Sequence, residues 1–68
     1  MTRVTAPQAA EIVSAHRMTI YRWVEEGLLP AERATRRKVI LIDVGDLKRF
    51  AKENGYGFNE ALAKEYAK

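Results

Sequence analysis

The chain has 68 residues and a formal net charge of +3, and a chain this short buries only about 60% of its unfolded surface, so it forms one small domain. Hydrophobic residues make up 47% of it and charged residues 31%, which excludes a disordered segment, because disorder needs low hydrophobicity and high net charge. The sequence has no cysteine, no apolar run of roughly 20 residues and no signal-peptide pattern, so we expect a cytoplasmic protein without disulfides or a membrane helix.

The first predicted helix opens with a capping box at residues 5–8. Thr5 is its N-cap, and the Gln8 side chain can reach back to the Thr5 N–H. The helix is expected to end near Ser14 or Ala15. Its apolar stripe at helical spacing comprises Ala9, Ile12 and Val13. This pattern predicts an amphipathic helix with one face in the core.

The second predicted helix runs from about Arg17 to Glu26, and Gly27 provides its C-terminal stop. At 100° per residue, its core face comprises Ile20, Trp23 and Val24. The opposite face comprises Met18, Tyr21, Arg22 and Glu25. Two short helices joined around His16 form a helix-turn-helix skeleton in which neither helix is stable alone.

A short hairpin is predicted next, with strands at Ala31–Ala34 and Lys38–Ile42. The turn between them falls at residues 35–37. The second strand contains a β-branched run, and the turn is rich in basic residues. We call residues 31–42 the basic hairpin, and it corresponds to the wing of a winged helix-turn-helix.

Asp43 is predicted to cap a third helix, with Asp46 in the first turn, where negative charge suits the helix dipole. The apolar stripe of this helix comprises Val44, Leu47, Phe50 and Ala51. Asn54 and Gly55 close it. Asn59 can then cap a fourth helix that runs to the C-terminus.

Together these elements predict a mostly α-helical chain with a small β-hairpin. The fold class is a winged helix-turn-helix, in the order α-α-β-β-α plus a C-terminal helix. Residues 1–54 form the winged helix-turn-helix domain, and residues 55–68 form a linker and the C-terminal helix.

Positive charge is concentrated in Arg17–Arg22 and Arg33–Lys38, which together hold six basic residues and no acidic one. The rest of the chain holds six basic and nine acidic residues, so +6 in two short segments stands against −3 elsewhere. This asymmetry is expected at an anion-binding face. A merely solvated charged loop is the alternative explanation for the second segment.

The sequence offers little for catalysis or metal binding. The only serine, Ser14, and the only histidine, His16, are two residues apart and do not face each other on a helix. The four glycines are spread along the chain or mark turns, whereas a phosphate-cradling loop needs them clustered. We therefore expect no enzyme, no cofactor and no metal site.

Ten residues between positions 5 and 27 match the sequence pattern of a known protein family. They are Thr5, Gln8, Ala9, Ala10, Thr19, Ile20, Tyr21, Arg22, Trp23 and Gly27. In this pattern the chain resembles the excisionase-type and MerR-like winged helix-turn-helix family. Gly27–Pro30 is similar to the end of the second helix in MerR proteins, and Ile42–Phe50 to the strand-to-helix segment of the family. The resemblance covers about Val4–Lys52.

The resemblance implies that the second helix enters the DNA major groove and that the basic hairpin contacts the backbone or the minor groove. The residues expected to contact double-stranded DNA are Arg17, Met18, Thr19, Tyr21, Arg22, Arg33, Arg36, Arg37 and Lys38. Arginine suits guanine or phosphate, and a tyrosine hydroxyl can reach a phosphate oxygen. Met18 opposes the core face and suits a thymine methyl group.

Some side chains on the second helix have alternative roles. Tyr21 can be a partly buried ring at the helix edge, and Arg22 can pair with Glu25 or Glu26. Trp23 is assigned to the core rather than to base stacking. Glu25 also lies on the face proposed to contact DNA, which counts against the assignment of that face. The carboxylate is compatible with it if it lies outside the groove or accepts a hydrogen bond from cytosine N4.

The chain departs from the family pattern in the turn, where Ser14 replaces a glycine and His16 replaces a serine N-cap. The turn is therefore expected to be less tightly fixed, with His16 as a turn or cap residue or as a phosphate contact. Val39 and Leu41 replace charged residues on the outer face of the second hairpin strand. The C-terminal helix is expected to cover that face, within the chain or on a neighbouring copy. The interface would comprise Val39, Leu41, Phe58, Leu62 and Tyr66, and a frayed tail is the alternative.

The function that the resemblance implies is that of a small sequence-specific DNA-binding protein like the excisionases of phages and mobile elements, which assist an integrase. A MerR-like transcription regulator and a phage terminase DNA-binding domain use the same parts and remain alternatives. MerR regulators carry a long dimerisation helix, whereas this chain ends soon after its third helix. A protein-interaction adaptor is the alternative from another class. The expected partners are double-stranded DNA, an integrase and other copies of the chain.

Overall fold

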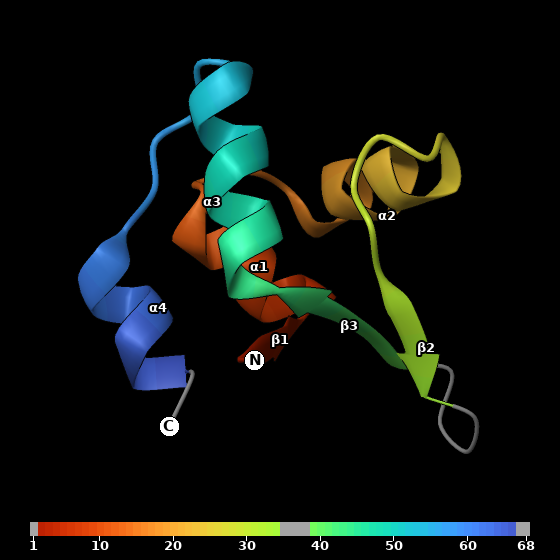
Figure 1. Cartoon of the computed structure of the whole chain (residues 1–68), viewed down its shortest axis with the longest axis horizontal. Coiled ribbons are helices and arrows are strands. Elements are labelled where there is room, and N and C mark those ends of the chain that lie inside the picture. Colours follow the sequence, from red (N-terminus) through yellow and green to blue (C-terminus); the bar gives the residue numbers. More distant parts are fainter. Residues whose placement is uncertain (1, 35–38, 67–68) are drawn as a thin grey trace.

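The computed structural model describes residues 2–34 and 39–66 (Figure 1). Its elements, in order, are β1 (Arg3–Thr5), α1 (Ala6–Ile12), α2 (Arg17–Glu25), β2 (Glu32–Ala34), β3 (Val39–Asp43), α3 (Val44–Glu53) and α4 (Glu60–Tyr66). The predicted fold class is confirmed, because the described part is mostly helical and carries a small antiparallel sheet compatible with a winged helix-turn-helix. None of the helices in this part is long and apolar enough to cross a membrane.

Strand β1 is an element that the sequence does not predict. It pairs antiparallel with β3, which also pairs with β2, so the sheet order is β1-β3-β2. Val4 lies opposite Ile42 in this pairing, and both side chains are buried, at 1% and 0% exposed. Three residues are too few to show a strand period, and the partner strand lies far along the chain, so only tertiary pairing defines β1.

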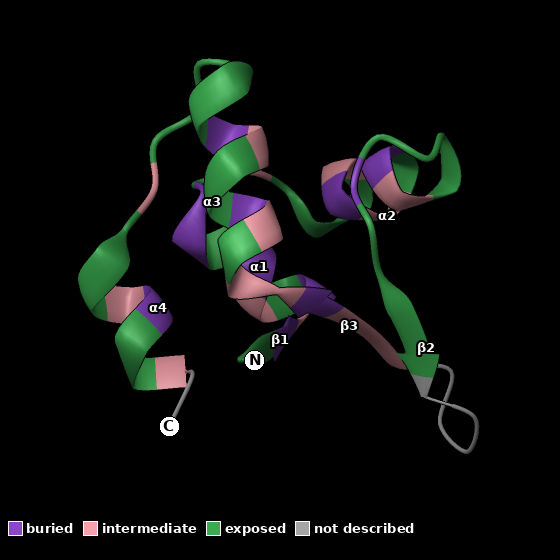
Figure 2. Cartoon of the chain, in the orientation of Figure 1, coloured by how far each residue is buried: buried purple, intermediate pink, exposed green. Residues whose placement is uncertain are grey.

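The hydrophobic core lies where α1, α2 and α3 meet the sheet, and the buried positions of these helices face it (Figure 2). The largest fully buried side chains are Ile12, Ile20, Leu29, Ile42, Leu47, Val4 and Val13. Trp23 is 8% exposed, and its ring centroid lies 4.6 Å from that of Phe50 and 4.9 Å from that of Tyr56. The predicted core position of Trp23 is confirmed, and its ring joins α2 to α3.

The predicted N-caps of three helices are confirmed. Thr5, Asp43 and Asn59 each accept a backbone N–H of the following helix on a side-chain oxygen, at 3.4, 2.8 and 3.0 Å. The Gln8 side chain also accepts the Thr5 N–H at 3.0 Å, which completes the capping box. Each such cap stabilises its helix by about 1 kcal/mol.

Helices α1, α2 and α3 all end in the same backbone motif. In each, an N–H two residues past the helix cap bonds to the carbonyl five residues earlier, at 2.9, 2.9 and 2.8 Å. The residue before that N–H has a positive φ, +56° at Ser14, +75° at Gly27 and +76° at Gly55. A side chain in this left-handed region costs roughly 1–2 kcal/mol, which glycine avoids. Among these three motifs, only the one between α1 and α2 has a non-glycine residue, Ser14, at the left-handed position, so its backbone is strained there.

Helix α4 packs on α1, not on the outer face of β3. The Asn59 N–H donates to the Ile12 carbonyl at 2.9 Å, the Tyr66 hydroxyl donates to the Glu11 carboxylate, and Ala63 is 3% exposed. The partly buried side chains of its apolar stripe, which join the core, are Phe58, Leu62 and Tyr66. In Figure 1, α4 and β2 lie on opposite sides of α3. The prediction that α4 covers Val39 and Leu41 within the same chain is therefore wrong, and so is the frayed-tail alternative for residues 60–66.

Helix α4 packs on α1 because its apolar side chains join the hydrophobic core there, whereas the outer face of the sheet carries an ion pair. Arg3 and Glu32 stand on the two edge strands, and Arg3 Nη1 lies 2.6 Å from Glu32 Oε2. This pair spans the middle strand beside Leu41, which lies opposite Glu32 in the register. Val39 and Leu41 remain only partly buried, and their contact with a neighbouring copy stays a prediction.

Candidate nucleic-acid interface

Helix α2 has two sharply different faces. Ile20 and Trp23 are buried at 0% and 8% exposed. The exposed side chains of the helix include Arg17, Met18, Arg22 and Glu25, and Tyr21 lies at their edge, partly buried against the core. We call these five residues the outer face of α2. The structure thus brings together the α2 residues that the sequence analysis selected, with Thr19 half-buried on the flank.

Within the part of the chain that the structure describes, the charged side chains on the outer face of α2 form no ion pairs. In residues 2–34 and 39–66, the ion pairs are Arg3–Glu32 and Lys48–Glu60, and neither involves α2. The alternative pairing of Arg22 with Glu25 or Glu26 is therefore not formed. Basic side chains stand at the N-terminal end and in the middle of the outer face, and its one carboxylate, that of Glu25, stands in the last turn. This arrangement leaves two guanidinium groups available to an anionic ligand.

The N-terminus of α2 differs from those of α1 and α3. His16 occupies the N-cap position with extended backbone, but its side chain makes no capping hydrogen bond. Its carbonyl accepts the N–H groups of Thr19 at 2.9 Å and Ile20 at 3.3 Å. The N–H groups of Arg17 and Met18 precede this first bond, so they point out of the helix end, where they can donate to a phosphate oxygen. The sequence signal for this feature is a histidine where a side-chain cap is expected.

Strand β2 of the basic hairpin lies on the same side of α3 as α2 (Figure 1). Arg33 in β2 is exposed and pairs in register with Ile40, whose side chain packs against the core. Cross-strand partners share a face of the sheet, so Arg33 lies on the helix-packed side, away from the Arg3–Glu32 pair. The other residues predicted for this hairpin, Arg36, Arg37 and Lys38, lie outside the described residues.

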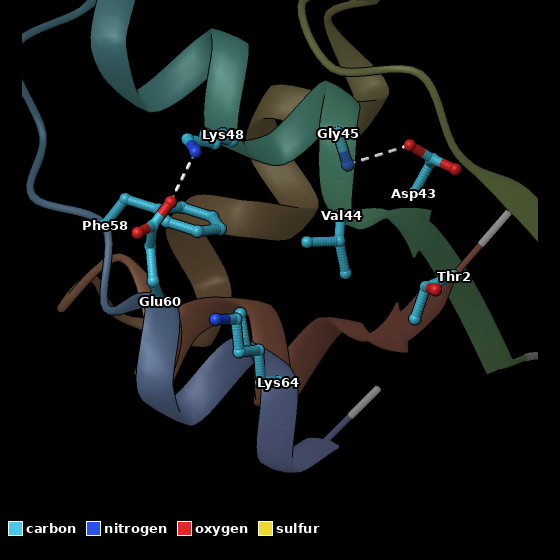
Figure 3. A pocket seen from close by; sticks show the side chains of 9 residues that line it. Thr2, Asp43, Val44, Gly45, Lys48, Phe58, Glu60 and Lys64 are labelled. Carbon is cyan, nitrogen blue, oxygen red and sulfur yellow. Dashed lines mark hydrogen bonds and ion pairs between the residues drawn. The ribbon is translucent and has the colours of Figure 1, made fainter. Parts of the chain in front are cut away.

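A hollow of about 390 Å³ lies between the first turn of α3 and α4, away from α2 (Figure 3). Its polar walls are largely occupied by internal contacts. Asp43 accepts the Gly45 N–H at 2.8 Å, and Glu60 is bonded to Lys48. The Lys48 Nζ also lies 5.9 Å from the centre of the Phe58 ring. In the described part of the chain, no three His, Asp or Glu side chains converge on a position that could hold a metal ion.

The comparisons with known proteins agree with this geometry. A family described as "Helix-turn-helix domain" matches residues 4–55. The matched segment starts in β1, includes α2 and the basic hairpin, and ends just after α3, so α4 lies outside it. No curated protein and no solved structure gives a significant match.

Proposed function

Since the chain belongs to the helix-turn-helix domain family, we propose that it binds specific sequences in double-stranded DNA through the outer face of α2. The observation that carries this proposal is the contrast between the two faces of α2. Ile20 and Trp23 fix the helix on the core, while Arg17 and Arg22 are exposed and take no part in the ion pairs of the described residues. A helix held in this way suits insertion into the major groove, which admits an α-helix.

Each polar group on the outer face has a distinct task in this proposal. The guanidinium forks of Arg17 and Arg22 bind guanine O6 and N7 or grip phosphates. The hydroxyl of Tyr21 reaches a phosphate oxygen, and the phosphate at the helix end is held by the Arg17 and Met18 N–H groups, with His16 beside them. Phosphate contacts set the register of the helix on the duplex, and base contacts set its sequence preference.

The basic hairpin supplies the second contact. Arg33, Arg36, Arg37 and Lys38 lie in one short segment, and basic side chains gain from the negative potential of a narrow minor groove or of the backbone. Replacing Arg36 and Arg37 with alanine is expected to weaken binding to all sequences alike. Arg17→Ala is expected also to relax discrimination between sites, by about 1–3 kcal/mol if the side chain reads a base.

We propose that the biological role is that of an excisionase-like architectural factor, which binds beside an integrase and assists recombination. The support is the resemblance of residues 5–27 to the excisionase and MerR pattern. A MerR-like transcription regulator would use the same residues, so DNA bending and integrase recruitment, measured on one duplex, separate the two. We propose no catalytic activity and no cofactor.

The test of DNA binding is a titration of duplex DNA over a series of salt concentrations. If about five basic side chains contact phosphates, log K falls against log salt with a slope near −4 to −5, at about −0.9 per phosphate. A protein-interaction adaptor with incidental basic segments would show weak binding and a flat salt dependence. That result would contradict the proposed function.

A further inference from the structure

The most exposed large hydrophobic side chain in the described residues is that of Met18, at 66%, ahead of Leu28 at 54% and Tyr56 at 41%. Met18 does not belong to the hydrophobic core or to the partly buried side chains packed on it. It lies in the first turn of α2, on the side of the helix opposite Ile20 and Trp23. An unburied thioether thus stands among the basic side chains of the proposed DNA contact.

We propose that Met18 contacts the 5-methyl group of a thymine and makes binding by α2 dependent on that methyl group. The inference rests on the proposed function, since it assigns a base preference to the same face. The thymine methyl is the apolar group that base pairs present in the major groove, and the other groups there are hydrogen-bond donors and acceptors. A thioether can accept no strong bond from them, but it is flexible and polarisable, so it fits a methyl group well.

The position of Met18 along α2 strengthens this assignment. With a rise of 1.5 Å per residue, Met18 lies about 6 Å along the axis from Arg22 and about 10 Å from Glu25. The N-terminal residues of a helix of this kind approach the bases most closely. Met18 is therefore placed to meet a base edge, with Arg22 on the same face one turn later and Glu25 near the end of the contact.

Removing one buried methyl group costs roughly fourfold in an equilibrium constant, which is the size of effect expected here. The experiment first selects preferred duplexes from a random pool with the wild-type chain. Each thymine is then replaced in turn by deoxyuridine, which keeps every hydrogen-bonding group and lacks only the methyl. Affinities are measured for the wild type, Met18→Ala and Leu28→Ala. Leu28 is the matched control, because it is an exposed apolar residue beyond the end of α2.

The expected result is a roughly fourfold loss for the wild type at one thymine, with no such loss for Met18→Ala. Leu28→Ala should keep the thymine preference. The inference is overturned if the wild type binds tightly but tolerates deoxyuridine at every position, or if Met18→Ala keeps the full preference. If the wild type binds no duplex DNA at all, the proposed function itself fails.

Discussion

Helices α2 and α4 are both short and amphipathic, but the chain holds them in different ways. Helix α2 buries Ile20 and Trp23 deeply and leaves its polar side chains outside the internal ion pairs of the described residues. Helix α4 buries only Ala63 fully, and its Glu60 and Tyr66 side chains bond to α3 and α1. The difference teaches that α2 leaves its outer face open for the proposed DNA contact, whereas α4 supports the domain from the opposite side of α3.

The largest expected effect comes from removing the side chain that fixes α2. Trp23→Ala should destabilise the domain by about 3–5 kcal/mol, because it deletes a buried ring that contacts Phe50 and Tyr56. Unfolding in urea, followed by circular dichroism, measures this loss. Met18→Ala on the exposed face of the same helix should change stability by less than about 0.5 kcal/mol. Equal effects of the two substitutions would mean that α2 is not anchored by its buried face.

Deleting α4 should have a smaller effect on stability. A chain ending at Gly57 keeps Tyr56 on Trp23 but loses the Asn59–Ile12 bond and the partly buried side chains of α4. The expected loss is about 1–3 kcal/mol, because the apolar burial is partial and the helix costs entropy to order. Thermal unfolding measures the loss, and DNA affinity is compared at a temperature where both chains are folded. A large loss of affinity there would show that α4 takes part in binding.

The strained junction between α1 and α2 predicts a gain in stability. Ser14→Gly should stabilise the domain by about 0.5–1 kcal/mol, because glycine has no Cβ to clash at a φ of +56°. The melting temperature should rise by roughly 2–8 °C. Ser14→Ala is the control, since it keeps the Cβ and should give no such gain. Gly27→Ser makes the reverse change at the end of α2 and should destabilise by a similar amount.

The attachment of α4 to α3 should depend weakly on pH. The hydrogen bond and the positive charge of Lys48 lower the pKa of Glu60 below its ordinary value of 4.5. A carboxylate whose pKa is lower in the folded state than in the unfolded state stabilises the fold at pH values above the unfolded-state pKa. This stabilisation is lost as the pH falls through the folded-state pKa. Wild type should therefore be slightly more stable than Glu60→Gln near neutral pH, and the two should converge in acid. Glu65→Gln is the control, because its carboxylate forms none of the ion pairs in the described residues.

The parts of the fold that follow from local sequence signals are predictable. The caps at Thr5, Asp43 and Asn59 depend on hydrogen bonds within a few residues, and the faces of α2 follow from helical periodicity. Strand β1 and the docking of α4 depend on partners far along the chain. The apolar stripe predicts that α4 packs against another element. Whether that element is α1 or β3 depends on surfaces that form only when the whole chain has folded.

For the candidate site, the sequence identifies the outer face of α2, because burial of Ile20 and Trp23 determines what is left exposed. It does not decide whether Arg22 pairs with Glu25 or Glu26, since spacing permits both outcomes. The role of each side chain on DNA stays a prediction, and so do the contacts of the basic hairpin.

The central claim is that DNA binds the outer face of α2 rather than any positively charged surface. The direct measurement compares the affinity for duplex DNA of Arg17→Ala/Arg22→Ala with that of Lys52→Ala/Lys64→Ala, which has the same net charge but alters exposed residues of α3 and α4. The account predicts that the α2 variant loses at least about tenfold in affinity and lowers the salt slope by up to about 2, with little change in the control. Equal losses in the two variants would contradict it.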